Sequence, residues 1–200
     1  KLPAGISMDQ LVGSALGLQG ARLYATEPIH SMLNAQLLAI DQLSQKYDIR
    51  LLIPYLVSRQ ELDHWSRYIR QFLTQSIPIG AMVETPAAAL DYRHWLDIAD
   101  FIAIGTNDLT QYLLAVDRNN THVADIYDDL HPAVLRALIQ VVAGAKRYQR
   151  EVSVCGEMAG NPAAAVLLLG MGVDSLSMNG GSDPRVGGRG GYFKSSGQFE

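Results

Sequence analysis

The chain of 200 residues fits one ordinary domain or a piece of a larger one, and its 48% of hydrophobic residues is enough for a sizeable core. A net charge of −4, from 16 Lys and Arg against 20 Asp and Glu, indicates no nucleic-acid-binding surface. A single cysteine, no signal peptide and no apolar run long enough for a bilayer exclude the secreted, fibrous and membrane-inserted classes, so we expect an α/β domain in the reducing cytoplasm.

Short apolar strands alternate with helices along the chain. The predicted strands comprise residues 20–24, 50–53, 77–83, 101–104, 152–154 and 173–178. The predicted helices comprise residues 29–46, 58–71, 87–96, 109–116, 131–150 and 162–169. Three helix starts carry clear signals, because Ser58 and Glu61 have the spacing of a capping box and a proline follows both Thr85 and His131.

This alternation is typical of parallel strands covered by helices on their outer face. A closed (β/α)8 barrel and an open doubly wound sheet both produce it. The chain has no G-x-G-x-x-G or G-x-x-x-x-G-K loop, so no motif favours a nucleotide-binding open sheet. A complete barrel takes about 250 residues, and a barrel built from this chain would lack its first strands.

The last 21 residues differ from the rest, because they hold seven of the 18 glycines and show no period of 2 or 3.6. Such a composition predicts a flexible tail. We therefore divide the chain into a folded part, residues 1–179, and a glycine-rich tail, residues 180–200.

Polar and reactive side chains follow the predicted strands at their C-terminal ends. They are Glu84, the pair Asn107 and Asp108, Cys155, and Asn179. Because the carboxyl ends of parallel strands meet on one face, where ligands bind, Glu84 and Asp108 are expected to converge there. Two carboxylates, with water and substrate completing the shell, suit Mg²⁺.

Each of these residues also has a purely structural interpretation. Asn107 and Asp108 could cap the helix that follows them, and Cys155 could be a small core thiol. Arg118 could be an ordinary surface charge. Glu84 is harder to explain in this way, because the threonine after it already fits the helix cap. The five histidines show no metal-ligand spacing.

Four motifs at these positions closely resemble one known family. They are MVETPAAA (82–89), IGTNDLTQYLLAVDRNN (104–120), VCGEMAG (154–160) and LLLGMGVDSLSMN (167–179). In this order they resemble the C-terminal phosphoenolpyruvate-binding domain of enzyme I, the phosphoenolpyruvate–protein phosphotransferase of bacterial phosphotransferase systems. The resemblance extends from about residue 16 to residue 186.

The resemblance implies a (β/α)8 TIM barrel, here partial, that binds phosphoenolpyruvate and Mg²⁺ and forms a homodimer. It implies Glu84 and Asp108 as metal ligands, and Asn107 and Asp108 in the stretch that holds the substrate phosphate. Arg118 resembles the arginine that neutralises this phosphate. Cys155 resembles the residue that protonates the enolate carbon as pyruvate forms.

The chain also departs from the family pattern. The family's third barrel strand carries two arginines, and here Gln19 replaces the first while Arg22 keeps the second as a substrate-binding residue. The first two strands have no counterpart. The Gly-Gly-x-x-Ser-His motif of the family's phosphohistidine domain is absent from the chain, so the phosphoryl acceptor and the histidine-containing phosphocarrier protein are expected as separate partners.

Two main interpretations remain at this stage. The first is the phosphoenolpyruvate- and Mg²⁺-binding part of a phosphotransferase that transfers the phosphoryl group to a protein histidine and releases pyruvate, in sugar transport or in the nitrogen-regulatory branch. The second is a degenerate, non-catalytic barrel module that acts in dimerisation or partner binding. A Mg²⁺-dependent lyase acting on pyruvate-like substrates is a third.

Overall fold

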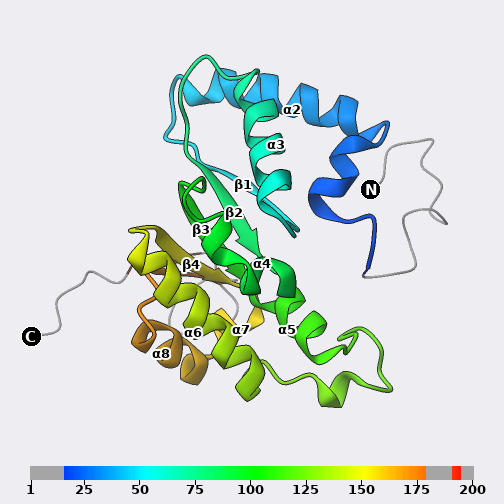
Figure 1. The fold of residues 1–200 in the computed structure, drawn as a ribbon, viewed down its shortest axis with the longest axis vertical. Coiled ribbons are helices and arrows are strands. Elements are labelled where there is room, and N and C mark those ends of the chain that lie inside the picture. Colours follow the sequence, from blue (N-terminus) through cyan, green and yellow to red (C-terminus); the bar gives the residue numbers. More distant parts are fainter. Residues whose placement is uncertain (1–15, 179–190, 195–200) are drawn as a thin grey trace, which may run out of the picture.

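A sheet of mainly parallel strands with helices packed on it forms the framework of the chain (Figure 1). This computed structural model describes residues 16–178 and 191–194. The strands are β1 (Leu51–Ile53), β2 (Ile79–Val83), β3 (Phe101–Gly105), β4 (Glu151–Cys155), β5 (Ser175–Met178) and β6 (Gly191–Lys194). The α-helices are α2 (Ile29–Ser44), α3 (Arg59–Arg70), α4 (Pro86–Leu90), α5 (Thr106–Leu114), α6 (Pro132–Arg147), α7 (Glu157–Gly160) and α8 (Pro162–Gly170). Short 3-10 helices are η1 (Gly20–Ala25), η2 (Tyr92–His94) and η3 (Ala124–Ile126).

The strands lie in chain order, from β1 to β6, and the first five are parallel. Helices connect the parallel neighbours, so this is a run of βα units, and α2 and α3 lie at one end of the long axis while α6 and α8 lie at the other (Figure 1). The observed α/β fold agrees with the predicted segment of a (β/α)8 barrel.

The two faces of the sheet differ in burial, and β4 shows this most clearly. Val152 and Val154 are fully buried, whereas Ser153 and Cys155, which point the other way, are only half-buried. The same helix-covered face holds Ile102 of β3 in the core. Alternation of this kind gives one packed outer face and one more open inner face, as in the wall of a barrel.

The three helix starts that carry clear sequence signals are confirmed, whereas the helix predicted for residues 109–116 begins earlier, at Thr106. Ser58 caps α3, because its Oγ accepts a hydrogen bond from the backbone N–H of Glu61 at 3.3 Å, and the Glu61 carboxylate accepts from Val57 N–H at 2.8 Å. Thr85 Oγ1 accepts from Ala88 N–H at 3.1 Å to cap α4. These caps satisfy backbone N–H groups that the first helical turn leaves without partners.

The strand predicted for residues 20–24 is wrong, because this segment forms the 3-10 helix η1. Gly20 has a φ of +49°, and the Arg22 backbone N–H bonds back to Gln19 O at 3.1 Å. A short apolar run fits a strand or a helical turn equally well from sequence. Here the segment packs against the end of β1, where Ala21 N–H donates to Pro54 O, and this contact favours the helical turn.

The helix predicted for residues 87–96 ends earlier, at Leu90, and continues after a break as η2. The Trp95 indole N–H donates to Ala88 O at 3.1 Å, and this indole is buried. Tyr92 packs so closely on α6 that a Cβ on Gly144 would come within 2.2 Å of its ring. Burial of two large aromatic side chains thus outweighs continuation of the helix.

The glycine-rich tail contains one element that the sequence did not predict. Residues 191–194 form β6, which pairs antiparallel with β5. The other tail residues and Asn179 lie outside the described part of the chain, so the flexible tail and the division at residue 179 stay predictions for them. Within the described ranges, no helix is long and apolar enough to cross a membrane.

Candidate functional site

Glu84 lies directly after β2 as a nearly buried carboxylate, with 9% of its surface exposed. Its Oε1 accepts a hydrogen bond of 2.7 Å from the backbone N–H of Tyr55, which follows β1. Its Oε2 lies against Gly105 of β3, where a Cβ would stand only 2.9 Å away. Residues from three successive strand ends thus fix this carboxylate in place.

Asp108 lies in the first turn of α5, next to Glu84. Burial raises the pKa of Glu84 to about 6, the Tyr55 N–H opposes this rise, and the charge of Asp108 and its hydrogen bond to Glu84 add to it. Two carboxyl groups in contact disfavour two simultaneous negative charges. The pair that the sequence predicted to converge is therefore in contact.

A pocket of about 260 Å³ holds both carboxylates together with Arg118. Arg118 supplies the positive charge among the described lining residues, and its backbone N–H donates to Gln111 Oε1 at 3.2 Å. Its Nη1 is buried and has no hydrogen-bond partner within the described part of the chain. A buried donor of this kind is costly unless a ligand satisfies it. Gln19, at the position of the missing family arginine, lines the same pocket.

Asn107 is adjacent to the pocket but plays a different part in the structure. Its side-chain Oδ1 accepts a hydrogen bond of 2.9 Å from the Glu157 backbone N–H, and its carbonyl accepts from the Tyr127 hydroxyl at 3.2 Å. Gly156 makes this contact possible, because a Cβ there would stand 2.8 Å from Asn107 Oδ1. Asn107 thus joins the end of β3 to the turn after β4.

Cys155 ends β4 on the open inner face of the sheet. Its Sγ lies 3.9 Å from Sδ of Met82 and 3.5 Å from the carbonyl oxygen of Ile104. Burial raises the pKa of this thiol, and the negative charges of Glu84 and Asp108 raise it further. The thiol therefore keeps its proton near neutral pH, which suits a proton donor and disfavours a thiolate nucleophile.

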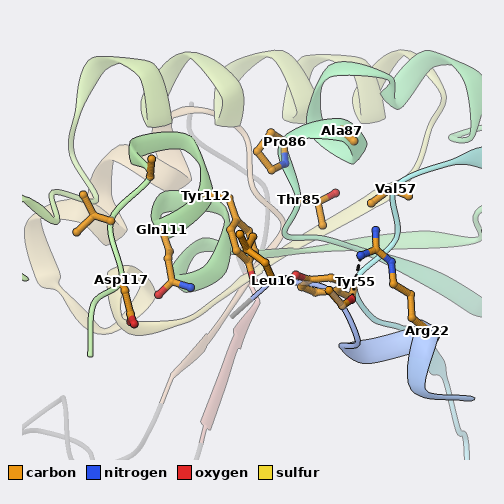
Figure 2. Close-up of a pocket in the computed structure, with 13 residues that line it drawn as sticks. Leu16, Arg22, Tyr55, Val57, Thr85, Pro86, Ala87, Gln111, Tyr112 and Asp117 are labelled. Carbon is orange, nitrogen blue, oxygen red and sulfur yellow. Dashed lines mark hydrogen bonds between the residues drawn. The ribbon is translucent and has the colours of Figure 1, made fainter. Parts of the chain in front are cut away.

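Arg22 is not brought into the pocket with Glu84 and Asp108. It lines a second, larger pocket of about 720 Å³, which Figure 2 shows. Its guanidinium lies 5.3 Å from the centre of the Tyr55 ring, donates to Gly17 O at 2.9 Å and approaches the Glu61 carboxylate at 4.0 Å. Arg22 thus contacts Tyr55, which lines both pockets, but Arg22 itself lines only the larger one.

The residues shared by both pockets are Tyr55, Gln111 and Tyr112, and none of the three was predicted from the sequence as a site residue. The hydroxyl of Tyr55 donates to that of Tyr112 at 3.0 Å, with the rings edge to face. Burial raises the pKa of Tyr112, as does its bond to Tyr55. Tyr55 could have been predicted from its position, because it comes shortly after the C-terminal end of β1, and Glu84 comes directly after the end of β2.

No group of three or more His, Cys, Asp or Glu side chains that could hold a metal occurs in the part of the chain that the structure describes. Glu84 and Asp108 provide two oxygen-bearing side chains, and their mutual repulsion would be relieved by a bound cation. Mg²⁺ commonly takes one or two carboxylates and keeps water or substrate oxygens for its other positions. The pair therefore fits Mg²⁺ by its donor chemistry.

Comparisons with known proteins give the same result as the motifs. Residues 2–187 match the family described as PEP-utilising enzyme, PEP-binding domain. A protein of Salmonella typhimurium strain LT2 named phosphoenolpyruvate-dependent phosphotransferase system is 41% identical over an alignment of 187 residues, and the alignment covers 86% of this chain and 24% of that protein. The phosphoenolpyruvate-protein phosphotransferase of Cupriavidus necator is 40% identical over an alignment of 185 residues, and the alignment covers 88% of this chain and 31% of that protein. The chain thus spans about a quarter to a third of these relatives.

The fold has a counterpart among solved structures. A citrate lyase from Burkholderia xenovorans LB400 superposes with a TM-score of 0.56 over 74% of this chain and 50% of its own, at 17% identity. A likeness at this identity concerns the fold alone. It supports the fold class assigned above.

Proposed function

Because the chain belongs to the PEP-utilising enzymes, in which it matches the PEP-binding domain, we propose that it forms the phosphoenolpyruvate-binding part of a phosphoenolpyruvate–protein phosphotransferase. The whole reaction would transfer the phosphoryl group to a protein histidine and release pyruvate. The observation that carries this proposal is the pocket in which Glu84, Asp108 and Arg118 meet. Its carboxylates suit a cation, and its guanidinium suits a phosphate.

In this proposal Glu84 and Asp108 hold Mg²⁺. The bound metal would supply positive charge that stabilises the transferring phosphoryl group and the enolate. Arg118 donates hydrogen bonds to phosphate oxygens, and its buried Nη1 gains the partner it lacks among the described residues. Asn107 holds the end of β3 against the turn after β4, so that the phosphate-binding stretch keeps its shape.

Cys155 has a separate role, as the donor of the proton that converts the enolate carbon to the methyl group of pyruvate. The support for it is the protonated state that burial and the neighbouring carboxylates impose on the thiol. Arg22 is proposed as a substrate-binding residue by the family resemblance. It would have to leave its stacking position on Tyr55 to reach the pocket.

The partners and location follow from the same assignment. We propose a cytoplasmic homodimer that receives phosphoenolpyruvate and passes the phosphoryl group through a phosphohistidine domain to a histidine-containing phosphocarrier protein. A Multiphosphoryl transfer protein of Xanthomonas campestris, 42% identical over 178 residues, supports a place in such a relay. The phosphotransferase names of the relatives favour this function over a non-catalytic module.

Calorimetry on the 200-residue chain tests the proposal. Phosphoenolpyruvate is expected to bind in the presence of Mg²⁺, and Glu84→Gln or Asp108→Asn is expected to abolish the metal-dependent binding. Asp48→Asn is the matched control, because it removes one charge from an exposed carboxylate that does not line the pocket. Normal binding of metal and ligand by Glu84→Gln would refute the assignment of the site.

A further inference from the structure

Tyr55 has an unusual backbone conformation beside the candidate metal site. Its φ is +59°, a left-handed value that non-glycine residues seldom adopt. Such conformations persist only where the surrounding structure enforces them, and they concentrate at functional sites. No motif in the sequence explains the presence of a tyrosine here.

Several contacts enforce this conformation. Gly20 packs directly on Tyr55, since a Cβ on Gly20 would stand 2.2 Å from the Tyr55 Cβ. The Tyr55 hydroxyl bonds to Tyr112, and the Arg22 guanidinium covers the ring. The side chain is thus fixed on more than one side, and only 7% of the residue is exposed.

The left-handed turn has one consequence for the site, because it delivers the Tyr55 main-chain N–H to Oε1 of Glu84 at 2.7 Å. On its other side the carboxylate meets Gly105, which leaves room for Oε2. We propose that Tyr55 is a positioning residue, whose strained backbone and Gly105 together hold the Glu84 carboxylate in the orientation that binds the cation. This proposal rests on the metal site proposed above and adds a residue to it.

Backbone conformation, rather than the phenol group, is the property that matters in this role. Glycine at position 55 adopts positive φ without cost and keeps the N–H, whereas a β-branched valine opposes it. A hydrogen bond to a charged group is strong enough that its loss is expected to weaken cation binding about tenfold or more. Tyr55→Gly is expected to lose less than about threefold, because the bond is retained.

Mn²⁺ binding to the intact chain, followed by electron paramagnetic resonance, measures these effects in Tyr55→Val and Tyr55→Gly. The matched control is Gln149→Val, because Gln149 is exposed and also has a left-handed φ, of +55°. This control is expected to lower the melting temperature and to leave Mn²⁺ affinity unchanged. The role of Tyr55 would be overturned if Tyr55→Val bound Mn²⁺ as tightly as the wild type. It would also be overturned if Gln149→Val lost as much Mn²⁺ affinity as Tyr55→Val.

A second measurement needs no substitution at Tyr55. In chain labelled with 15N-tyrosine, Mg²⁺ is expected to shift the Tyr55 amide signal in the wild type and to leave it unmoved in Glu84→Gln. Tyr47, which is 63% exposed and lines neither pocket, serves as the internal reference. A Tyr55 signal that stays unmoved while the wild type binds Mn²⁺ contradicts the inference alone. A wild type that binds neither ion refutes the metal site itself.

Discussion

At the scale of single residues, Glu84 is placed where its charge costs stability in the absence of a cation. It is nearly buried, it contacts a second carboxyl group, and its pKa rises from 4.5 to about 6. The pKa of Glu84 is higher in the folded state than in the unfolded state, so protonation of Glu84 favours folding. This contribution to the free energy of unfolding is complete below about pH 4.5 and is lost as the pH rises through about 6. Binding energy from a cation can offset this cost.

The first prediction concerns the stability of Glu84→Gln in EDTA. At pH 7.5 the variant is expected to be more stable than the wild type by up to about 2 kcal/mol, because it removes the raised-pKa carboxylate and keeps an oxygen for the Tyr55 N–H. At pH 4.5 the two should unfold at the same temperature. Thermal melts at both pH values check this, and a destabilised variant at pH 7.5 would contradict it.

The second prediction concerns Cys155, the chain's single cysteine, whose modification is therefore unambiguous. Because burial and two carboxylates raise the pKa of its thiol, reaction with a thiol reagent at pH 8 should be about tenfold or more slower than in the denatured chain. Glu84→Gln removes one of the charges and should speed the reaction, whereas Asp48→Asn should not. Equal rates in the folded and denatured chain would refute the description of this site.

At the scale of elements, the turn between β4 and α7 joins two parts of the site. Gly156 takes a φ of +106°, which L-residues rarely adopt, and its Cα passes close to Thr106 and Asn107. The Thr106 hydroxyl donates to the Cys155 carbonyl at 2.9 Å across the same turn. A side chain at position 156 would therefore separate the ends of β3 and β4.

The third prediction is that Gly156→Ala lowers stability by about 2 kcal/mol or more, because its Cβ would stand 2.5 Å from Thr106 Oγ1 in a strained conformation. Gly170→Ala is the matched control, since nothing lies within 4 Å of the added Cβ at the end of α8. The control should be neutral or slightly stabilising. Differential scanning calorimetry compares the two, and equal melting temperatures would exclude this function of Gly156.

At the scale of the whole molecule, the parallel sheet gathers the pocket from distant parts of the chain. The pocket's lining comes from η1, the ends of β1 and β2, and α5 with the loop that follows it. None of the five histidines lines it. Three of them have structural hydrogen-bond partners instead, because His30 bonds to Tyr24 and Tyr68, His94 bonds to Asp91, and His131 caps α6.

The fourth prediction follows from this arrangement. The 200-residue chain incubated with Mg²⁺ and 32P-labelled phosphoenolpyruvate should remain unlabelled, because a histidine acceptor has to enter the pocket from another domain or protein. Addition of a phosphohistidine domain should transfer the label to that domain. Acid-labile label on any histidine of this chain alone would refute the proposed division of roles.

Sequence patterns alone were enough to predict most of the order of elements and the contact between the two carboxylates of the candidate site. Strand β3 and the caps at Ser58 and Thr85 could be predicted because a buried strand needs a short apolar run and a helix start needs a side-chain acceptor. Glu84 and Asp108 could be predicted to meet because parallel strand ends share one face.

Local conformations that depend on contacts between distant segments could not be predicted from the sequence. Residues 20–24 form a turn because Gly20 packs on Tyr55, and α4 stops at Leu90 where Tyr92 packs on Gly144. Contacts between distant segments also set the left-handed backbone of Tyr55 and its bond to Glu84. They likewise hold Arg22 outside the pocket, on the Tyr55 ring. Local sequence encodes propensity and hydrophobic period, whereas these features arise from packing and hydrogen bonds between residues far apart in the chain.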